Sequence, residues 1–261
     1  MFELIEKVKE VNPLVLHYTN EVTINDCANI TLAIGASPLM SYSYEELEEI
    51  VSKASSVVIN IGTMKSANLD LFLQAGKMAN KYNKPVVLDP VGVFATEERK
   101  KLTDKLINEV NFNVIKGNIA EIKFIGGYEG NGQGVDAKES YEDISNIIKE
   151  IAKKMKTIIV ATGKIDFISD GGKIIKIENG SELLKKVTGT GCMIGSLIAS
   201  FLGAEGINIE AVSMGVLSMG VAGELASKNC KGIGSFKAEL MNNIFNLDSK
   251  KLEEVAKITV K

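Results

Sequence analysis

The sequence predicts an α/β domain with a central, mostly parallel sheet that is flanked by helices on both faces. In the middle of the chain, short runs that are apolar throughout alternate with helical patterns. Strands of that kind belong to parallel sheets that are covered on both sides. The 261 residues suffice for one large domain, and no low-complexity linker divides them. We therefore expect a single domain over residues 1–261.

The expected strands and helices follow one another along the chain. A charged amphipathic helix is expected over residues 1–10, and His17 lies on an apolar strand after it. In the helix expected at 69–82, Phe72, Leu73 and Ala79 recur with the spacing of one helix face. The fully apolar strands are expected at 56–62, 85–90, 112–116 and 157–161, and the helices between them at 69–82, 97–110 and from about 118.

The second half of the chain changes character. Two short apolar runs, 165–169 and 173–178, surround Asp170-Gly171-Gly172, which predicts a hairpin and hence an antiparallel edge of the sheet. After Gly191 the chain is expected to be helical to about Leu247, with buried helices at 193–202 and 211–226. The stretch 126–137 contains five glycines and is expected to form a surface loop.

Composition excludes several classes of protein. The net charge of −3 argues against the basic surface that nucleic-acid binding requires, so no nucleic-acid partner is expected. The three cysteines show no paired spacing, which favours a reducing compartment over a disulfide framework or a zinc site. The charged N-terminal segment does not resemble a signal peptide, and no uncharged apolar run of about 18 residues predicts a membrane span. We expect a cytoplasmic protein without a membrane partner.

The most informative segment is the glycine-rich run at 187–196, Val-Thr-Gly-Thr-Gly-Cys-Met-Ile-Gly-Ser, which opens an apolar helix. Glycines allow backbone N–H groups to approach an anion, and a helix N-terminus adds partial positive charge. Cys192 falls on the first turn of that helix, where a thiolate is favoured over a thiol. Two interpretations stay open at this point: a phosphate-binding loop with a reactive cysteine, or a tight turn before a buried helix with Cys192 as core filler.

Polar residues follow the expected strands at their carboxyl ends, where open parallel sheets bind ligands. Asp89 and Glu121 lie at two such ends, and both are candidates to share a site with the Gly189 loop. Two carboxylates near a phosphate require a cation between them, which points to Mg²⁺. Lys116, at another strand end, could neutralise phosphate charge. The polar strand-end segments are 60–63, 89–92, 116–118 and 162–163.

Each of these residues also has a structural interpretation that the sequence leaves open. Asp89 could start a turn before Pro90, Glu121 could complement the dipole of its helix, and Lys116 could be a solvated strand end. His17 and Met40 are by default core residues, and Asn20 or Asn25 could cap a helix. The chain has no GxxxxGK[ST] motif, and its late GxGxxxG loop argues against a dinucleotide-binding fingerprint.

Seven blocks of the sequence resemble, in order, those of the hydroxyethylthiazole kinases, and they extend from about residue 13 to 200. Seven ordered blocks are more specific than any one of them alone. The blocks are His-Tyr-Thr-Asn at 17–20, Gly-Ala-Ser-Pro-Leu-Met at 35–40, Asn-Ile-Gly-Thr at 60–63, Asp-Pro-Val-Gly at 89–92, Gly-Asn at 117–118 with Glu121, Ala-Thr-Gly at 161–163 and Val-Thr-Gly-Thr-Gly-Cys at 187–192.

The resemblance implies a ribokinase-like fold and ATP-dependent phosphorylation of the primary alcohol of 4-methyl-5-(2-hydroxyethyl)thiazole, a step of thiamine biosynthesis or salvage. Family members are typically homotrimers with the thiazole site at a subunit boundary. The resemblance would assign Met40, Gly189, Asn20 and Asn25 to the thiazole substrate, Lys116 and Thr162 to ATP, Asp89 and Glu121 to Mg²⁺, and the amides of Gly189, Thr190 and Gly191 to an anion hole.

Cys192 matches the position at which most ribokinase relatives carry an aspartate base, and thiazole kinases resemble this chain in having cysteine. We expect Cys192 to assist deprotonation of the alcohol only modestly and the loop amides to contribute more, because phosphoryl transfer depends mainly on positioning and charge stabilisation. The chain departs from the family pattern at Lys116, usually arginine, and at 232–237, usually Gly-Pro-Gly-Ser-Phe-Arg.

Three other functions remain as alternatives. One is a kinase of the same fold that acts on another alcohol, such as hydroxymethylpyrimidine, although the segment from His17 to Met40 is distinctive of thiazole kinases. Another is the ADP-dependent hydrate dehydratase built on a related fold. The third is a nucleotide sensor without catalysis, against which the presence of Asp89, Glu121 and Cys192 argues.

Overall fold

The computed structural model describes residues 1–128 and 140–261. Of the loop expected at 126–137, residues 129–137 lie outside the described residues. Gly126 is the last residue of a helix, and Gly127 ends that helix with a left-handed φ of +83°. The beginning of the expected loop is therefore a helix terminus.

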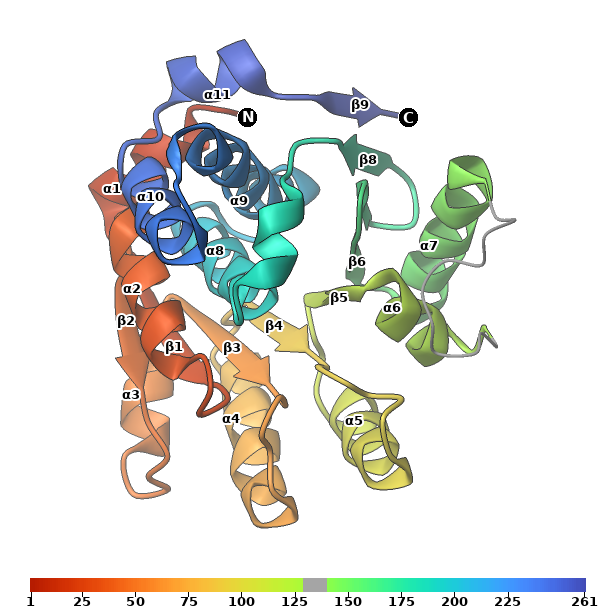
Figure 1. Ribbon diagram of the computed structural model, residues 1–261. Helices are drawn as coiled ribbons and strands as arrows, with labels where there is room; N and C mark the ends of the chain where they lie inside the picture. The colour runs from red at the N-terminus through yellow and green to blue at the C-terminus, as the bar shows by residue number, and fades with distance from the viewer. Residues whose placement is uncertain (129–139) are drawn as a thin grey trace.

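One sheet runs through the described part of the chain (Figure 1). Six neighbouring strands are parallel, and three strands on one side are antiparallel. In spatial order the strands are β2 (Ser37–Met40), β1 (Leu14–Tyr18), β3 (Ser56–Asn60), β4 (Val86–Asp89), β5 (Val114–Asn118), β6 (Ile158–Thr162), β7 (Asp166–Ser169), β8 (Ile174–Ile177) and β9 (Ile258–Val260).

These strands confirm the predicted α/β class, the four expected apolar strands and the antiparallel hairpin β7–β8. The two outermost strands were not expected. β2 has four half-buried residues including Pro38, and β9 has three, mostly exposed. Neither segment carries the continuous apolar pattern of a central strand, because an edge strand has a neighbour on one side alone.

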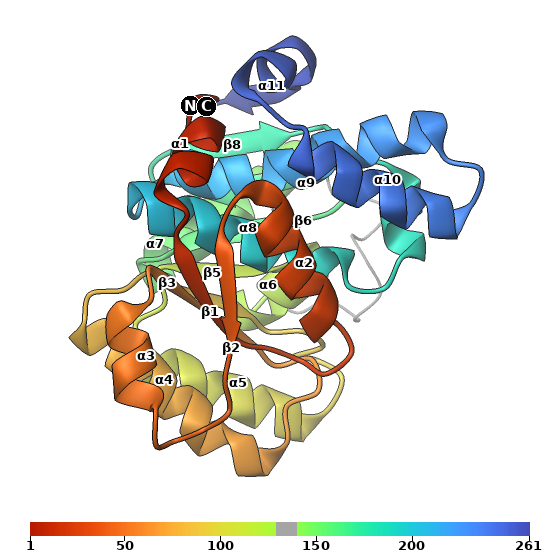
Figure 2. The same ribbon diagram turned by 90° about the vertical axis from the view of Figure 1, so that its left-hand side faces the viewer.

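Helices cover both faces of the sheet (Figure 2). The pleat divides the strands between the faces: Val58 packs into the core on one side, and its neighbours Val57 and Ile59 into the core on the other. One face carries α1 (Leu4–Val11), α2 (Ile24–Ile34), α8 (Thr190–Glu205), α9 (Ile209–Asn229), α10 (Ile233–Phe245) and α11 (Ser249–Val255), and the other carries α3 (Leu47–Lys53), α4 (Leu69–Lys81), α5 (Glu97–Glu109), α6 (Ile119–Gly126) and α7 (Tyr141–Met155).

α8 and α9 are the expected small-residue helices, and their small side chains permit close packing. At Gly215 on α9, an added Cβ would lie 2.6 Å from the backbone nitrogen of Ile198 on α8. α9 is the one described helix that is long and apolar enough to cross a membrane, yet 83% of its most apolar window is buried inside the fold. Its burial is that of a core helix.

The carboxyl ends of the parallel strands lie at one edge of the sheet, and α8 begins beside them (Figure 1). The short 3₁₀ helix η2 (Glu182–Lys186) leads into the glycine-rich loop before α8. Because all these elements converge there, the polar strand ends predicted from the sequence come together beside the loop.

Candidate active site

The glycine-rich loop turns into α8 at Gly189, which has a left-handed φ of +92° and is the N-cap of the helix. A Cβ at this position would lie 2.8 Å from Cγ2 of Thr23 on the neighbouring loop. Both the backbone conformation and the close approach therefore require glycine here. The first N–H groups of a helix have no partner within the helix, so the loop presents donors at the sheet edge.

Thr190 stabilises this loop through its side chain. Its hydroxyl donates to the carbonyl oxygen of Leu184 at 2.8 Å and lies 3.3 Å from that of Val187. Only the backbone of Thr190 is therefore placed to contribute to the predicted anion hole. Its hydroxyl ties α8 to η2.

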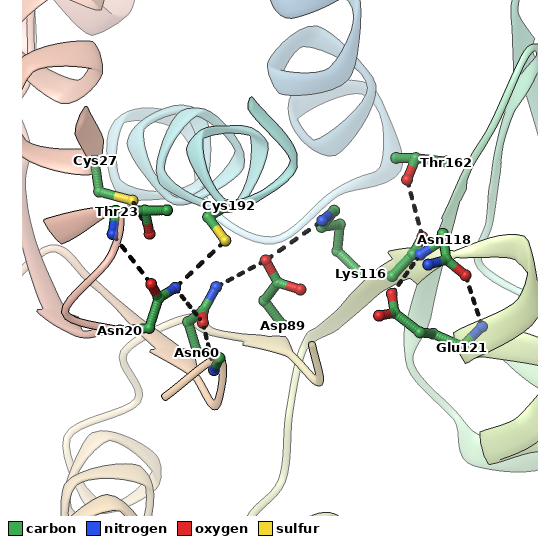
Figure 3. A network of polar contacts seen from close by, with 12 residues as sticks. Asn20, Thr23, Cys27, Asn60, Asp89, Lys116, Asn118, Glu121, Thr162 and Cys192 are labelled. Atoms are coloured by element: carbon green, nitrogen blue, oxygen red, sulfur yellow. Dashed lines mark hydrogen bonds and ion pairs between the residues drawn. The ribbon is translucent and has the colours of Figure 1, made fainter. Parts of the chain in front are cut away.

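A chain of buried hydrogen bonds runs beneath the first turn of α8 (Figure 3). The amide nitrogen of Asn20 donates to Oδ1 of Asn60 at 2.8 Å and to Sγ of Cys192 at 3.4 Å. The amide nitrogen of Asn60 donates to Oδ2 of Asp89 at 2.9 Å. Oδ1 of Asn60 also accepts from the backbone N–H of Gly62 at 2.9 Å. The ends of β1, β3 and β4 are thus joined to the start of α8.

Asp89 and Lys116 form a buried ion pair, in which Nζ of Lys116 lies 3.3 Å from Oδ2 of Asp89. The side chain of Lys116 is 5% exposed and that of Asp89 is 1% exposed. Burial raises the pKa of Asp89 to about 6; the charge of Lys116 opposes this shift, and that of Glu121 adds to it. Burial alone would lower the pKa of Lys116, but the nearby acids Asp89, Cys192 and Glu121 raise it above its ordinary value. The lysine is therefore charged at neutral pH.

The second oxygen of Asp89, Oδ1, is buried and has no hydrogen-bond partner among the described residues. Such an orphaned carboxylate oxygen suits a hard cation. The polar partners of Asp89 are the side chains of Asn60 and Lys116. The site therefore offers one buried carboxylate oxygen, without a hydrogen-bond partner among the described residues, next to the glycine-rich loop.

Glu121 lies in the first turn of α6 and forms a capping box with Asn118. Its Oε2 accepts from the backbone N–H of Asn118, and its Oε1 accepts from that of Gly92, both at 2.8 Å. The helix-start interpretation of Glu121 is confirmed. The carboxylate is nonetheless buried, and its charge raises the pKa of Asp89.

Cys192 does not have the low pKa that a helix start was expected to give it. Burial raises the pKa of its thiol, Asp89 raises it further, and Lys116 opposes the shift. Because the thiol is largely removed from water and lies near the Asp89 carboxylate, it stays protonated, and its sulfur accepts a hydrogen bond from Asn20. The structure thus favours a neutral Cys192.

The residues predicted to bind the thiazole do not all meet in one chain. Asn20 belongs to the buried network, and its Oδ1 also accepts from the backbone N–H of Thr23, the N-cap of α2. Asn25 is exposed on α2, and its carbonyl and side-chain oxygens accept from Asn29. Met40 is half-buried at the end of β2, beside His17 of β1.

His17 is a satisfied core residue, as its default interpretation expects. Nδ1 contacts the carbonyl oxygen of Val15, and Nε2 contacts the hydroxyl of Ser196, both at 3.0 Å. Because a carbonyl can only accept, Nδ1 carries the proton and Nε2 accepts from Ser196. Burial lowers the pKa of His17 to about 4, so the imidazole is neutral.

A cavity of about 490 Å³ opens beside the loop, between the ends of β5 and β6 and the helix α9. Thr162, predicted to contact ATP, lines it, and its hydroxyl donates to the carbonyl oxygen of Gly117 at 3.2 Å. Thr190 and Gly191 line the end nearest Lys116, since a Cβ on Gly191 would be 3.5 Å from Nζ of that lysine. The lining also includes Asn118, Gly163, Asp166, Asn179, Ile194 and Met219.

Two residues of the site were given no role of their own from the sequence. Asn60 links Asn20 to Asp89, and the sequence indicated it only as the first residue of the polar strand-end segment 60–63. Asp166 lines the cavity, and burial raises its pKa to about 7, opposed by the N–H of Gly163 and the charge of Lys116. Asp166 is the first residue of the antiparallel strand β7, which lies between β6 and β8. A polar residue at the start of a hairpin strand is ordinary, so no local signal marked it.

Comparison with known proteins identifies the family. The model of the hydroxyethylthiazole kinase family matches residues 5–250. A hydroxyethylthiazole kinase from Clostridioides difficile (strain 630) is 62% identical over 248 residues, covering 95% of this chain and 95% of that protein. One from Clostridium tetani (strain Massachusetts / E88) is 43% identical over 266 residues, covering 99% and 97%.

Solved structures agree with this assignment. The structure of a hydroxyethylthiazole kinase protein from Pyrococcus horikoshii OT3 matches with a TM-score of 0.92 and 35% identity, covering 100% of this chain and 98% of that one. A pyridoxal kinase from Staphylococcus aureus, solved with AMP-PCP and pyridoxal, matches with a TM-score of 0.66 and 14% identity, which shows a shared ribokinase-like fold alone. From the matching family model and the identity over nearly the whole chain, we conclude that the chain belongs to the hydroxyethylthiazole kinase family.

Proposed function

We propose that this protein acts as a single domain that transfers the γ-phosphoryl group of ATP to the primary alcohol of 4-methyl-5-(2-hydroxyethyl)thiazole, a step of thiamine biosynthesis or salvage. The observation that carries the proposal is the placement of the glycine-rich start of α8 beside the buried Asp89–Lys116 pair. Helix-start amides and a buried cation together stabilise the charge on a transferring phosphoryl group.

ATP is proposed to occupy the 490 Å³ cavity, with its phosphates directed toward Gly191 and Lys116. The apolar side chains of Ile194 and Met219 line this cavity and offer packing surface for a base. Thr162 lines the cavity, and its hydroxyl donates to the carbonyl oxygen of Gly117, which follows Lys116 on β5. This placement is in keeping with the contact to ATP predicted for both residues.

Mg²⁺ is proposed to bind between the phosphates and the two carboxylates Asp89 and Glu121. The orphaned Oδ1 of Asp89 fits such an ion. No group of three or more His, Cys, Asp or Glu side chains gathers in the described ranges, so the ion would keep water and phosphate ligands, as Mg²⁺ prefers. When bound, the ion would neutralise charge on the phosphates. Asn60 and Lys116 hold the Asp89 carboxylate in place for it.

The alcohol is proposed to lie near Met40, Asn20 and Gly189, with its hydroxyl facing the first turn of α8. Cys192, as a neutral thiol, would assist the loss of the hydroxyl proton only modestly. The amides of Gly189, Thr190 and Gly191 would stabilise the charge that develops on the phosphoryl oxygens.

We further propose a homotrimer in which a neighbouring subunit completes the thiazole site, and a cytoplasmic location. A groove of about 710 Å³ between α2 and α10 contains Asn25, and Leu32 and Phe245 on its rim are 56% and 65% exposed. Exposed apolar side chains around a groove are typical of a subunit interface. Burial against a neighbour would bring Asn25 into a site that one chain leaves incomplete. The three unpaired cysteines suit a reducing compartment.

Measurement of ADP release tests the proposed reaction. ADP release that depends on the thiazole alcohol, with little release in the presence of hydroxymethylpyrimidine, is the expected result. A preference for the pyrimidine would indicate a kinase for another alcohol. Repair of a hydrated nicotinamide cofactor with ADP present would indicate the dehydratase, and ATP binding without turnover on any alcohol would indicate a sensor. Each of these three outcomes would contradict the proposal.

A further inference from the structure

Arg99 is the single arginine among 30 basic residues, and its side chain binds backbone rather than an acid. Its Nη1 donates to the carbonyl oxygens of Ile61 and Val91, both at 2.9 Å. Its Nη2 donates to the carbonyl oxygen of Gly62 at 2.6 Å. One guanidinium group therefore joins the turn after β3 to the turn after β4, at the sheet edge that carries the candidate active site.

The position of Arg99 is not explained by the stability of its own helix. Arg99 is in the first turn of α5, where its backbone N–H caps onto Thr96. A positive side chain in the first turn of a helix is unfavourable because it opposes the helix dipole. The planar guanidinium group offers five donors in a fixed geometry, whereas an ammonium group is a compact point charge. Three carbonyls in two turns thus suit arginine and do not suit lysine.

Both turns held by Arg99 reach directly into the site. Gly62, whose carbonyl oxygen binds Arg99, donates its N–H to Oδ1 of Asn60. Val91, also bound to Arg99, precedes Gly92, whose N–H donates to Oε1 of Glu121. Arg99 therefore holds the same or the adjacent residue of the backbone whose N–H group binds the site: Gly62 for Asn60, and Gly92 for Glu121.

We propose that Arg99 is a positioning residue for phosphoryl transfer: it locks the turns after β3 and β4 so that Asn60 and Glu121 hold their orientation around Asp89. This inference rests on the proposed kinase function and on the two carboxylates as the Mg²⁺ site. Outer residues that orient metal ligands typically change metal affinity or activity by about 10- to 100-fold when they are replaced.

Arg99→Lys and Arg99→Met test the inference. We expect both variants to weaken Mn²⁺ binding, measured by electron paramagnetic resonance with AMP-PCP present, by about 10- to 100-fold. The half-saturating Mg²⁺ concentration for turnover should rise in parallel, with KM for the thiazole alcohol within about threefold, since the alcohol is proposed to lie near α8 rather than near these turns. Arg99→Lys should resemble Arg99→Met, because the fixed fork and not the charge is required.

Lys100→Met is the matched control, because it removes the neighbouring charge of α5 and an exposed ion pair with Asp104. It should bind Mn²⁺ as the unmodified protein does. Arg99→Ala should recover metal affinity when ethylguanidinium, but not ethylammonium, is added. Unchanged Mn²⁺ affinity in Arg99→Lys, or equal recovery with both cations, would overturn the positioning role. Failure of the kinase proposal would show differently, as absence of thiazole-dependent ADP release from the unmodified protein.

Discussion

At the scale of single residues, the Asp89–Lys116 pair dominates the electrostatics of the site. Removing both charges from water is unfavourable, and their mutual attraction offsets this only with further hydrogen bonds. Asn60 supplies one such bond to Oδ2, while Oδ1 is left without a described partner. The result is a carboxyl group whose pKa stays raised despite a lysine 3.3 Å away. A raised pKa together with an open oxygen is typical of a functional carboxylate.

The pH dependence of activity follows from this pKa. With the pKa of Asp89 at about 6, its carboxyl is protonated below that pH and loses its charge interaction with Lys116 and with a cation. We expect kcat/KM to be level above pH 6 and to fall about tenfold per pH unit below it, as for one essential base. A pH–rate profile checks this expectation.

The fold should respond to acid in the opposite sense. Since the pKa of Asp89 is higher in the folded chain than its ordinary 3.8, protonation of this group favours folding. That contribution is fully present below pH 3.8 and is lost as the pH rises through about 6, so acid inactivation near pH 5.5 should occur without unfolding. Asp166→Asn is the control, because the pKa of Asp166 is raised to about 7. Loss of the acid limb in that variant would contradict the assignment to Asp89.

Cys192→Ala tests the modest role of the thiol. Because burial and Asp89 keep the thiol protonated, we expect turnover to fall by less than about a thousandfold, within the range of a single general base. Single-turnover kinetics with ATP and the thiazole alcohol measure the effect. A larger loss would mean that Cys192 is the principal base and that the loop amides contribute less than proposed.

At the scale of elements, the start of α8 depends on how closely it approaches the loop before α2. Gly189 combines a left-handed φ with a close approach to Thr23 that leaves no room for a methyl group. These two constraints act together at one residue. They can be separated, because Gly206 at the end of α8 has a similar φ of +95° with nothing within 4 Å of an added Cβ.

Gly189→Ala and Gly206→Ala form a matched pair. Gly206 has φ +95° and ψ −178°, an extended backbone conformation that is essentially restricted to glycine. We expect Gly206→Ala to lower the free energy of unfolding by about 1–3 kcal/mol because of this backbone strain, with activity retained. Gly189→Ala should lower it further and should also reduce kcat, because the added methyl group displaces the loop amides. Urea unfolding and turnover measure both effects. Equal stability and activity of the two variants would mean that the contact with Thr23 does not matter.

The elements of the central sheet could be predicted because each carries its own local pattern. The apolar runs that became β3 to β6 differ from their expected bounds by one or two residues. β9 could not be predicted, since its three residues pair with β8 from the far end of the chain. The role proposed for Arg99 could not be predicted either, because it depends on hydrogen bonds to the carbonyl oxygens of residues 61, 62 and 91, which no sequence pattern indicates.

At the scale of the whole molecule, two cores on opposite faces of one sheet place the site at the edge where α8 meets the strand ends. The outer surface of α2 and α10 is not covered by the described chain, and its groove presents exposed Leu32 and Phe245. This surface would be buried in the proposed trimer.

Phe245→Asp tests the trimer. A charge at this 65% exposed apolar position would be unfavourable in a buried interface, so we expect sedimentation to shift from trimer toward monomer, with a rise in KM for the thiazole alcohol. Val260→Asp, at a 61% exposed position on β9, is the control and should leave the mass unchanged. An unmodified protein that sediments as a monomer would contradict the trimer outright.

The sequence by itself determined the class of fold, and it predicted the sheet edge of the candidate site and the residue types gathered there. Periodicity and strand-end polarity are local properties, so a single chain displays them directly. The tertiary structure decided how Asn20, Asn60 and Asp89 connect, that Cys192 is a neutral thiol, and that Asn25 faces outward. Those outcomes depend on burial and on hydrogen bonds between residues far apart in the chain, which exist only once the sheet has assembled.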